Sequence, residues 1–521
     1  MSRVIPLAAV LLIPAALAAA PVPPAPAPPS KPLTDAQRAE AEIFAPILVR
    51  VSDQIVTQYL RPVARQELIY SALAGLYERA RRTPTGTLHY DCARAGDEAA
   101  LVKLILQVRE DLGDAAELQG THPLLICCQA MARSLDPYTG VVSGEEQRRN
   151  TALEQDNSGV GLEIGDSPGP GPVVIKQVRP GGPAQRAGMR PGDEITHLDG
   201  RPVSELSAEK LVELLNHTPQ MGPPSVVAEQ QGVADLTRPL QVRYRRPGTP
   251  APAEVQLIRT RFRAETVLGV WRSKDNSWNY WLDPKEKVAH LRLATLAKGT
   301  AQEMCEVVAA LRKEGMRGLI LDLRWCPGGF LDEAVDCARL FLSDGVVSTV
   351  KTRAGEPLVH RCQEAGRFAA VPLVVLVNSE TMGGGELIAA ALQDHGRAKV
   401  VGQRTFGKAS VQTPLPLGLP NMGMKLTSGT FVRPSGKNLH RFPESSATDD
   451  WGVRPDEGME FRVSPELNRQ LRAWWQEVTL RPGSSRERLA LDDPGADAPQ
   501  QAALRAVLRV LEKKGPAKAE D

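Results

Sequence analysis

The chain has 521 residues, with 63 Lys and Arg against 61 Asp and Glu, so its net charge is +2. This balance argues against a nucleic-acid-binding protein, which normally carries a basic stripe, and 4% aromatic residues leave little surface for stacking on bases. The length predicts about three domains. The high content of Gly (44) and Pro (43) predicts long loops and linkers.

Residues 1–18 have the pattern of a secretory signal peptide. An apolar stretch follows Arg3, and Ala16-Leu17-Ala18 is a small-residue cleavage site. A membrane anchor is the alternative, but the stretch is short for a membrane span and is broken by Pro6 and Pro14. We therefore expect an exported protein, periplasmic or extracellular, without a stable membrane span after cleavage.

Seven cysteines follow the expected signal peptide, and an odd number cannot pair completely within one chain. They show no C-x-x-C spacing and no clustered His, which disfavours zinc. We expect neither a metal nor another cofactor.

The first half of the chain divides by composition. Residues 19–33 are a Pro-rich linker of the extended, polyproline type. Residues 34–157 are predicted to be a helical region, in which Thr34 and Gln37 have the spacing of a capping box. Residues 158–262 change to short strands and Gly/Pro turns, with a polar inserted loop at 218–238.

The second half alternates strand and helix over residues 266–462, which predicts parallel strands with crossover helices. The expected elements are strands at 288–293, 318–323 and 373–377 and helices at 300–314, 331–342 and 386–394. Residues 463–521 form a tail of two helices, which we expect to be peripheral. The fold class is thus mixed, α+β and α/β in several domains.

Two strand-to-helix junctions, 324–329 and 378–386, fall where ligands bind in α/β sheets, at the carboxyl ends of strands. Each is rich in glycine, which lets backbone N–H groups approach a substrate. A third segment, 404–412, would place Lys408, Ser410 and Gln412 on one face if it were a strand. A Lys in a partly dry cleft can act as a general base, because desolvation lowers its pKa.

Several separate motifs carry a family resemblance. LILDLRWCPGGFLDEAVDCARLFL begins at Leu319, ELIAAALQDHGRAKVVGQRTFGKASVQ at Glu386, and KLTSGTFVRPSGK at Lys425. Upstream, SLDPYTG begins at Ser134 and SGVGLEI at Ser158. In this order they resemble the carboxyl-terminal processing peptidase (tail-specific protease) family over roughly residues 130–460. The resemblance implies a PDZ domain at 158–262 and a crotonase-like peptidase core.

The resemblance also implies a Ser nucleophile, a Lys general base and a Gln that orients the Lys. Lys408 and Gln412 match the base and its partner, but the nucleophile position is occupied by Gly383. The family's oxyanion donors correspond to the amides of Gly328 or Gly329 and of Gly384. A second Ser common in this loop is likewise replaced, by Gly385.

Other hydroxyls are alternative nucleophiles. Ser379 lies four residues before Gly383, which at about 3.3 Å per extended residue is on the order of 10 Å away. Thr381 is nearer but precedes the turn, and Ser410 is interpreted as structural. His395 beside Asp394 suggests a Ser-His-Asp grouping, but their place at a helix C-terminus favours a structural or capping role.

The PDZ-like region has its own candidate site. The loop Gly159-Val160-Gly161-Leu162 can present backbone amides to the terminal carboxylate of a peptide that adds as a strand. Leu211 and Leu215, on a predicted helix starting at Ser207, would form the opposite wall. The alternative is a packed β-domain without a ligand.

Two functions remain open from the sequence. One is an active serine-type (Ser-Lys) endopeptidase that processes the C-termini of exported proteins with a displaced nucleophile. The other, favoured by Gly383, is a catalytically impaired relative that binds polypeptide C-termini through the PDZ domain. A cleft that holds a carboxylate near Lys408 also fits. In each case polypeptides are the expected partners.

Overall fold

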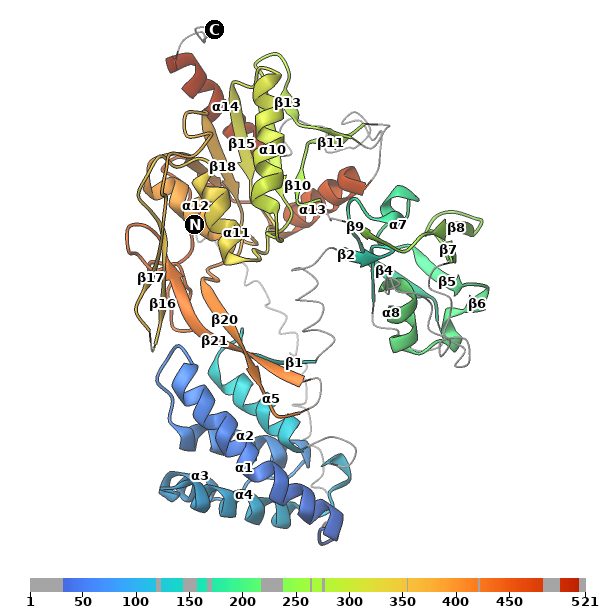
Figure 1. Cartoon of the computed structure of the whole chain (residues 1–521), viewed down its shortest axis with the longest axis vertical. Coiled ribbons are helices and arrows are strands. Elements are labelled where there is room, and N and C mark those ends of the chain that lie inside the picture. The colour runs from blue at the N-terminus through green and yellow to red at the C-terminus, as the bar shows by residue number, and fades with distance from the viewer. Residues whose placement is uncertain are drawn as a thin grey trace, which may run out of the picture. The chain divides into compact units, whose positions relative to one another are not determined.

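The computed structural model describes residues 31–118, 123–143, 157–165, 171–216, 238–262, 265–273, 277–353, 355–419, 422–480 and 497–514 (Figure 1). The expected signal peptide, most of the Pro-rich linker and nearly all of the inserted loop at 218–238 lie outside these residues. The chain divides into two compact units, the first comprising residues up to 57 and 62–141, and the second comprising 58–61 and everything from 142 on.

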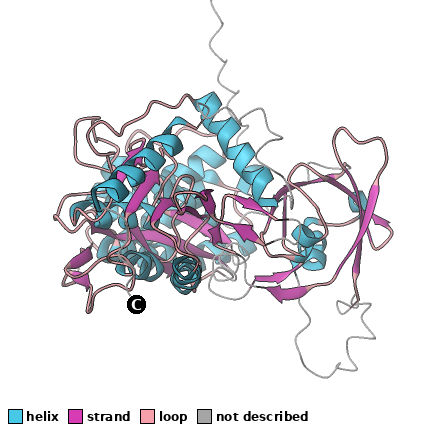
Figure 2. Cartoon of the chain, turned by 90° about the horizontal axis from the view of Figure 1, so that it is seen from above, coloured by secondary structure: helices cyan, strands magenta, loops and turns pink. Residues whose placement is uncertain are grey.

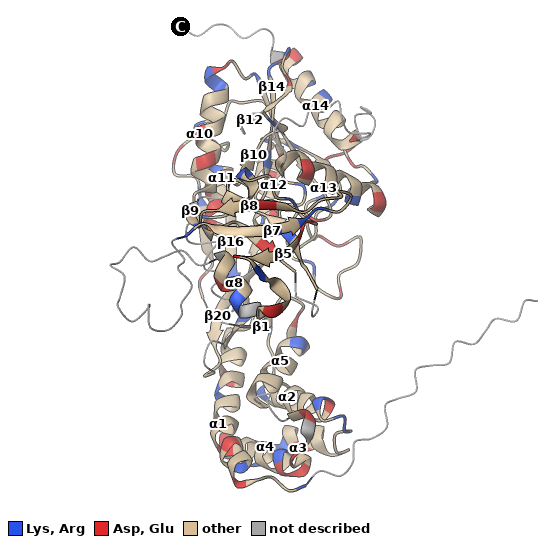
Figure 3. Ribbon diagram, turned by 90° about the vertical axis from the view of Figure 1, so that its right-hand side faces the viewer, with Lys and Arg blue, Asp and Glu red and all other residues tan. Residues whose placement is uncertain are grey.

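The first unit is helical. Its helices are α1 (Asp35–Gln58), α2 (Arg65–Arg79), α3 (Leu88–Arg94), α4 (Glu98–Leu112) and α5 (Pro123–Leu135), and strand β1 (Gly140–Ser143) follows them in the chain. The predicted capping box is confirmed, because the Thr34 N–H donates to Gln37 Oε1 at 2.9 Å and the Gln37 N–H donates to Thr34 Oγ1 at 3.3 Å. Acidic and basic residues are interspersed along these helices (Figure 3), so the charge balance of the composition also holds locally.

The second unit contains a central, mostly parallel sheet. Strands β14 (Val288–Leu293), β15 (Gly318–Asp322), β18 (Leu373–Val377) and β19 (Lys399–Gly402) run parallel in that order. Short antiparallel strands β10 (Val267–Leu268) and β13 (Trp281–Asp283) pair with β14. The predicted alternation of strand and helix is therefore confirmed; Figure 2 shows the strands with helices beside them.

Both faces of this sheet are covered. Leu319 and Leu321 of β15 pack with helices α10 (Thr300–Lys313), α11 (Leu331–Arg339) and α12 (Gly384–Asp394). Ile320, which points to the opposite face, packs with α13 (Pro465–Leu480) and α14 (Ala498–Lys514). The expectation of a peripheral tail is wrong, because the apolar strands of a parallel sheet need a cover on each face.

A second, antiparallel sheet carries the segment after Lys408. In it β21 (Met422–Val432) lies between β16 (Val346–Thr352) and β20 (Ser410–Pro416), and β17 (Leu358–Arg361) pairs with β16. A two-stranded ribbon, β11 (Trp271–Arg272) with β12 (Trp278–Asn279), lies between β10 and β13 in the chain.

The PDZ-like region is an antiparallel β-domain with a small core, to which Leu480 at the end of α13 also contributes. Its sheet has the order β3-β4-β5-β7-β8, with β6 paired to β5 and β2 paired to β9. The bounds are β2 (Asn157–Gly159), β3 (Leu162–Ile164), β4 (Val173–Val178), β5 (Glu194–Leu198), β6 (Arg201–Pro202), β7 (Leu240–Arg245), β8 (Ala253–Leu257), β9 (Thr260–Phe262), α7 (Pro183–Arg186) and α8 (Ala208–Asn216). Along the described part of the chain, no helix is both long and apolar enough to cross a membrane.

Candidate functional site

The two glycine-rich junctions lie together at the carboxyl ends of β15 and β18. The Met382 N–H donates to the Cys326 carbonyl at 2.9 Å, and the Trp325 N–H donates to Asn378 Oδ1 at 3.1 Å. These bonds fix one loop against the other, as expected for neighbouring parallel strands whose ends meet at one sheet edge.

Gly383 stands immediately before α12 with φ +57° and ψ −121°. A Cβ built on it would lie 3.6 Å from both Gly328 Cα and the Pro327 carbonyl oxygen, and 3.9 Å from the Lys408 carbonyl oxygen. These are ordinary van der Waals contacts, so the space for a side chain exists although the backbone lies in the left-handed region. The expected nucleophile position thus borders the loop that carries the expected base.

The residues expected to supply oxyanion donors are partly brought together. A Cβ on Gly328 would come within 2.8 Å of the Gly384 nitrogen, so these two backbone segments are in close contact. Gly329 instead forms a parallel bridge with Leu296. Gly384 is the first residue of α12, where helix N–H groups have no partner within the helix.

A buried carboxylate, which the sequence analysis missed, joins the nucleophile loop to the base loop. Glu386 Oε2 accepts hydrogen bonds from the N–H groups of Gly383 (3.1 Å) and Lys408 (2.8 Å), and Oε1 accepts one from the Gly407 N–H (2.7 Å) and one from the Thr405 hydroxyl. Its side chain is fully buried. Burial raises the pKa of Glu386 to about 7, against the lowering effect of these donors. The signal available in the sequence was a Glu three residues after the glycine that precedes the helix, which is the spacing of a capping box.

Lys408 lies in a loop, not in the strand that the sequence analysis considered. Strand β20 begins at Ser410, and its register against β21 shifts between Val411 and Gln412. Lys408 is half-buried, and burial first and Lys425 second lower its pKa, with Glu386 acting in the opposite direction. Gln412 lies on β20 opposite Thr427.

The alternative nucleophiles differ in their surroundings. The Thr381 side chain is fully buried, and its hydroxyl donates to the Leu323 carbonyl at 2.9 Å and accepts from the Asn378 N–H at 3.0 Å. Its role is therefore structural. Ser379 is exposed, in the turn after β18, whereas the Ser410 hydroxyl is buried and makes no hydrogen bond within the described residues.

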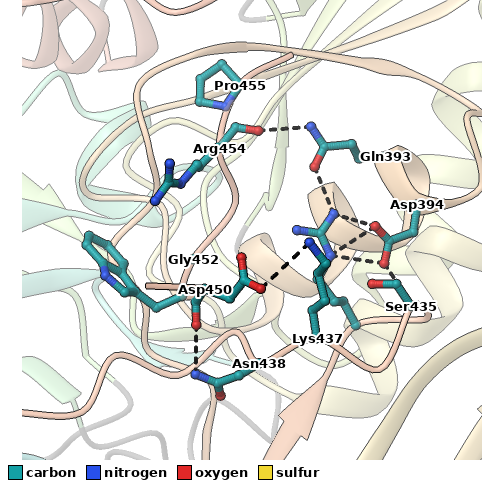
Figure 4. A pocket seen from close by; sticks show the side chains of 11 residues that line it. Gln393, Asp394, Ser435, Lys437, Asn438, Asp450, Gly452, Arg454 and Pro455 are labelled. Atoms are coloured by element: carbon teal, nitrogen blue, oxygen red, sulfur yellow. Dashed lines mark hydrogen bonds and ion pairs between the residues drawn. The ribbon is translucent and has the colours of Figure 1, made fainter. Parts of the chain in front are cut away.

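Asp394 and His395 lie at the other end of α12, on the order of 15 Å from Gly383 by the helix rise. The Asp394 carboxylate accepts from Arg433 Nε at 3.0 Å, and the His395 ring lies 2.7 Å from the Val346 carbonyl. A cavity of about 340 Å³ opens there, and Asp394 and Arg433 are among its lining residues (Figure 4). The Asp394 carboxylate and the His395 imidazole thus serve local structure, away from the two glycine-rich junctions.

A buried charge cluster supports the loop at 324–329. Arg324 donates to Asp322 Oδ2 at 2.7 Å and to Asp497, next to α14, at 2.8 Å, and His290 Nε2 lies 3.0 Å from Asp322 Oδ2. Burial by itself would raise the pKa of Asp322, but the Arg324 guanidinium and the His290 hydrogen bond hold it well below its usual range. Asp322 therefore stays ionised and fixes Arg324.

In the PDZ-like domain, β3 is an edge strand, with β4 as its one neighbour among the described strands. The Val160 N–H donates to the Leu215 carbonyl at the end of α8, at 2.9 Å. Leu211 and Leu215 are each 1% exposed and pack in the domain core with Leu162. The loop and helix expected to flank a peptide are thus adjacent and in direct contact with each other.

The model for peptidase family S41 matches residues 287–458, and that for the PDZ domain matches residues 174–220. The fold and these matches therefore define a peptidase-type core accompanied by a PDZ domain.

The chain is also similar to known proteins over about two thirds of its length. The chloroplastic C-terminal processing peptidase of Tetradesmus obliquus is 31% identical over 339 residues, which are 63% of this chain and 66% of that protein. The carboxyl-terminal-processing protease of Synechocystis sp. is 29% identical over 336 residues, 64% of this chain and 70% of that protein. A solved photosystem II D1 C-terminal processing protease aligns with 84% of this chain and 95% of that chain, at 24% identity and a TM-score of 0.41. Residues 287–458 thus match peptidase family S41, and the chain is similar to carboxyl-terminal processing (tail-specific) proteases; it spans just under two thirds of the algal relative's length.

Proposed function

We propose that this chain is an exported, catalytically impaired member of its family that binds polypeptide C-termini through its PDZ domain. Gly383 carries the proposal. Gly383 borders Gly328, Gly384 and Lys408. Its side chain is a hydrogen atom, whereas acyl transfer needs a nucleophilic hydroxyl at this position.

The contacts around Gly383 support the proposal that the two glycine-rich loops keep their peptidase arrangement although the nucleophilic hydroxyl is absent. The base loop is tied to the glycine loop through Glu386, and the amide of Gly384 stands at a helix N-terminus. Such donors stabilise a carbonyl oxygen or a carboxylate without any side chain. The cleft can therefore hold a polypeptide carbonyl or terminus while leaving its peptide bonds intact.

The PDZ domain supplies the proposed recognition. A peptide would extend the sheet at the free edge of β3, and its carboxylate would bind the amides of the loop Gly159-Val160-Gly161-Leu162. The Val160 N–H donates to the Leu215 carbonyl in the structure. When a peptide binds, this N–H would donate to the peptide carboxylate instead. Separation of α8 from β3 would open an apolar wall of Leu211 and Leu215 for the terminal side chain.

The test of catalysis is an assay of the purified mature protein on an unfolded polypeptide, beside Lys408→Ala and Ser379→Ala variants. We expect no cleavage by any of the three. Cleavage that is lost in both variants would instead establish an active peptidase with Ser379 as a displaced nucleophile.

The test of binding compares a peptide ending in an apolar residue with its C-terminally amidated form. We expect the amidated form to bind at least about tenfold more weakly, because it lacks the charge that the loop amides bind. Gly161→Ala should weaken binding, since its Cβ would lie 3.0 Å from Phe262 Cζ at φ +79°, whereas Gly188→Ala, at φ +77° and with no atom within 4 Å, is the matched control. Equal affinity for the free and amidated peptides would refute carboxylate recognition.

A further inference from the structure

Helix α13 lies beyond the matched peptidase domain, yet its first turns contact both glycine-rich loops, 324–329 and 378–386. Asn468 Oδ1 accepts hydrogen bonds from Trp325 Nε1 (3.2 Å) and from Asn378 Nδ2 (3.3 Å), and Asn468 Nδ2 donates to Glu380 Oε1 (2.6 Å). The two donors and one acceptor around it require this orientation of the amide, because only its oxygen can accept and only its nitrogen can donate.

These partners come from the two different loops. Trp325 precedes Gly328 in the loop after β15, whereas Asn378 and Glu380 precede Gly383 in the loop after β18. The loops also bond directly, through the Trp325 N–H and Asn378 Oδ1. Asn468 therefore closes a ring of hydrogen bonds that sets the separation of the loops.

Glu380 is held twice by the same helix. Arg472, one turn after Asn468, donates to Glu380 Oε2 at 2.6 Å. Spacing of four residues places Asn468 and Arg472 on one face of α13. The carboxylate of Glu380 thus receives one donor on each oxygen, and its loop cannot move away from α13 without breaking both bonds.

Trp325 needs such support, because it adopts φ +58°, a conformation that costs a non-glycine residue energy. Its N–H and its indole Nε1–H are both bonded, to Asn378 and to Asn468. Helix α13 is in turn fixed to the core, since Trp475 is 2% exposed and stacks with Arg292 at 4.2 Å. The anchor is therefore rigid enough to define a loop position.

We propose that Asn468 is a positioning residue that holds the two cleft loops, and with them the amides of Gly328 and Gly384, in register for a bound polypeptide. That the ligand is a polypeptide rests on the proposed function, whereas the role of Asn468 in aligning the two loops does not. The tests therefore measure the loops in the protein without any polypeptide.

The decisive variant is Asn468→Asp, alone and combined with Glu380→Gln. In the single variant, the carboxylate at position 468 faces the carboxylate of Glu380, so that two like charges replace a hydrogen bond. In the double variant the new amide at position 380 can donate to the carboxylate at position 468 and accept from Arg472, which restores every hydrogen bond. Amide hydrogen exchange in segments 324–330 and 378–386 should become about tenfold faster in the single variant, the change for about one net partly buried hydrogen bond. Exchange should return to the wild-type rate in the double variant.

The indole N–H resonance of Trp325 supplies a second readout. It should shift in Asn468→Asp and return in the double variant. Gln470→Glu is the matched control, because Gln470 also donates to a glutamate, Glu466, at 3.1 Å, but on the exposed side of α13; it should leave both readouts unchanged. Unchanged loop exchange in Asn468→Asp, failure of Glu380→Gln to restore it, or a double variant that does not fold would each overturn the proposal.

Discussion

The backbone N–H of Lys408 donates a 2.8 Å hydrogen bond to the buried carboxylate of Glu386. Because the same carboxylate oxygen also accepts from the Gly383 N–H, one side chain fixes the distance between the expected base and the expected nucleophile position.

Glu386→Ala should be strongly destabilising. It would leave three backbone N–H groups and the Thr405 hydroxyl without their acceptor in a buried site. Since one unsatisfied buried group costs about 1–3 kcal/mol, we expect a loss of at least about 3 kcal/mol in the free energy of unfolding. Urea denaturation measures it, and the exposed Glu457→Ala is the control; similar losses in the two variants would contradict this role.

The contribution of Glu386 to stability should depend on pH. Burial raises its pKa to about 7, above the value of 4.5 for an unperturbed glutamate. Because the pKa of Glu386 is higher in the folded than in the unfolded state, protonation of Glu386 stabilises the fold. This contribution is complete below about pH 4.5 and is lost as the pH rises through about 7. The stability of the wild type relative to Glu386→Gln, which does not titrate, should fall by up to about 3 kcal/mol over that range. Denaturation of both proteins at pH 4.5 to 8 checks it, and a constant or rising difference would refute it.

Gly383→Ser should create hydrolytic activity that depends on Lys408. The Cβ fits at 3.6 Å from its nearest neighbours, although the positive φ should cost about 1–3 kcal/mol of stability. We expect cleavage of an unfolded substrate at least about a hundredfold faster than by Gly383→Ser/Lys408→Met, because general base catalysis contributes about that factor or more. Gly385→Ser, with a hydroxyl two residues away, is the control. No gain, or an equal gain at position 385, would show that the cleft is not competent.

Gly328→Ala should cost more than Gly315→Ala. Their φ angles are +85° and +89°, so the backbone strain is similar. Only at position 328 would the new Cβ approach the Gly384 nitrogen, to 2.8 Å, whereas at 315 it meets nothing within 4 Å. Overpacking should therefore add about 1–3 kcal/mol at position 328. Denaturation midpoints compare the two variants, and equal shifts would mean that the contact relaxes freely.

Much of this fold could be predicted from the sequence because its signals are local. The continuous apolar run at 373–377 predicted a buried parallel strand, and Thr34 with Gln37 predicted a helix start; both are confirmed. The family motifs predicted a peptidase core of the tail-specific protease type with a PDZ domain, and the S41 and PDZ matches to residues 287–458 and 174–220 confirm this. The strand considered as one possibility for Lys408 is not formed, since β20 begins two residues later.

By itself, the amino-acid sequence determined the alternation of strands and helices in the peptidase core, the family resemblance and the glycine at position 383, because each of these is encoded in short, contiguous patterns. Only the tertiary structure decided that the tail covers a sheet face, that Glu386 joins two loops, and that Asn468 contacts Trp325, 143 residues away. Such contacts depend on where distant side chains meet after the sheet is covered. Hydrophobic periodicity reports which face of an element is buried, but not which residue lies against it.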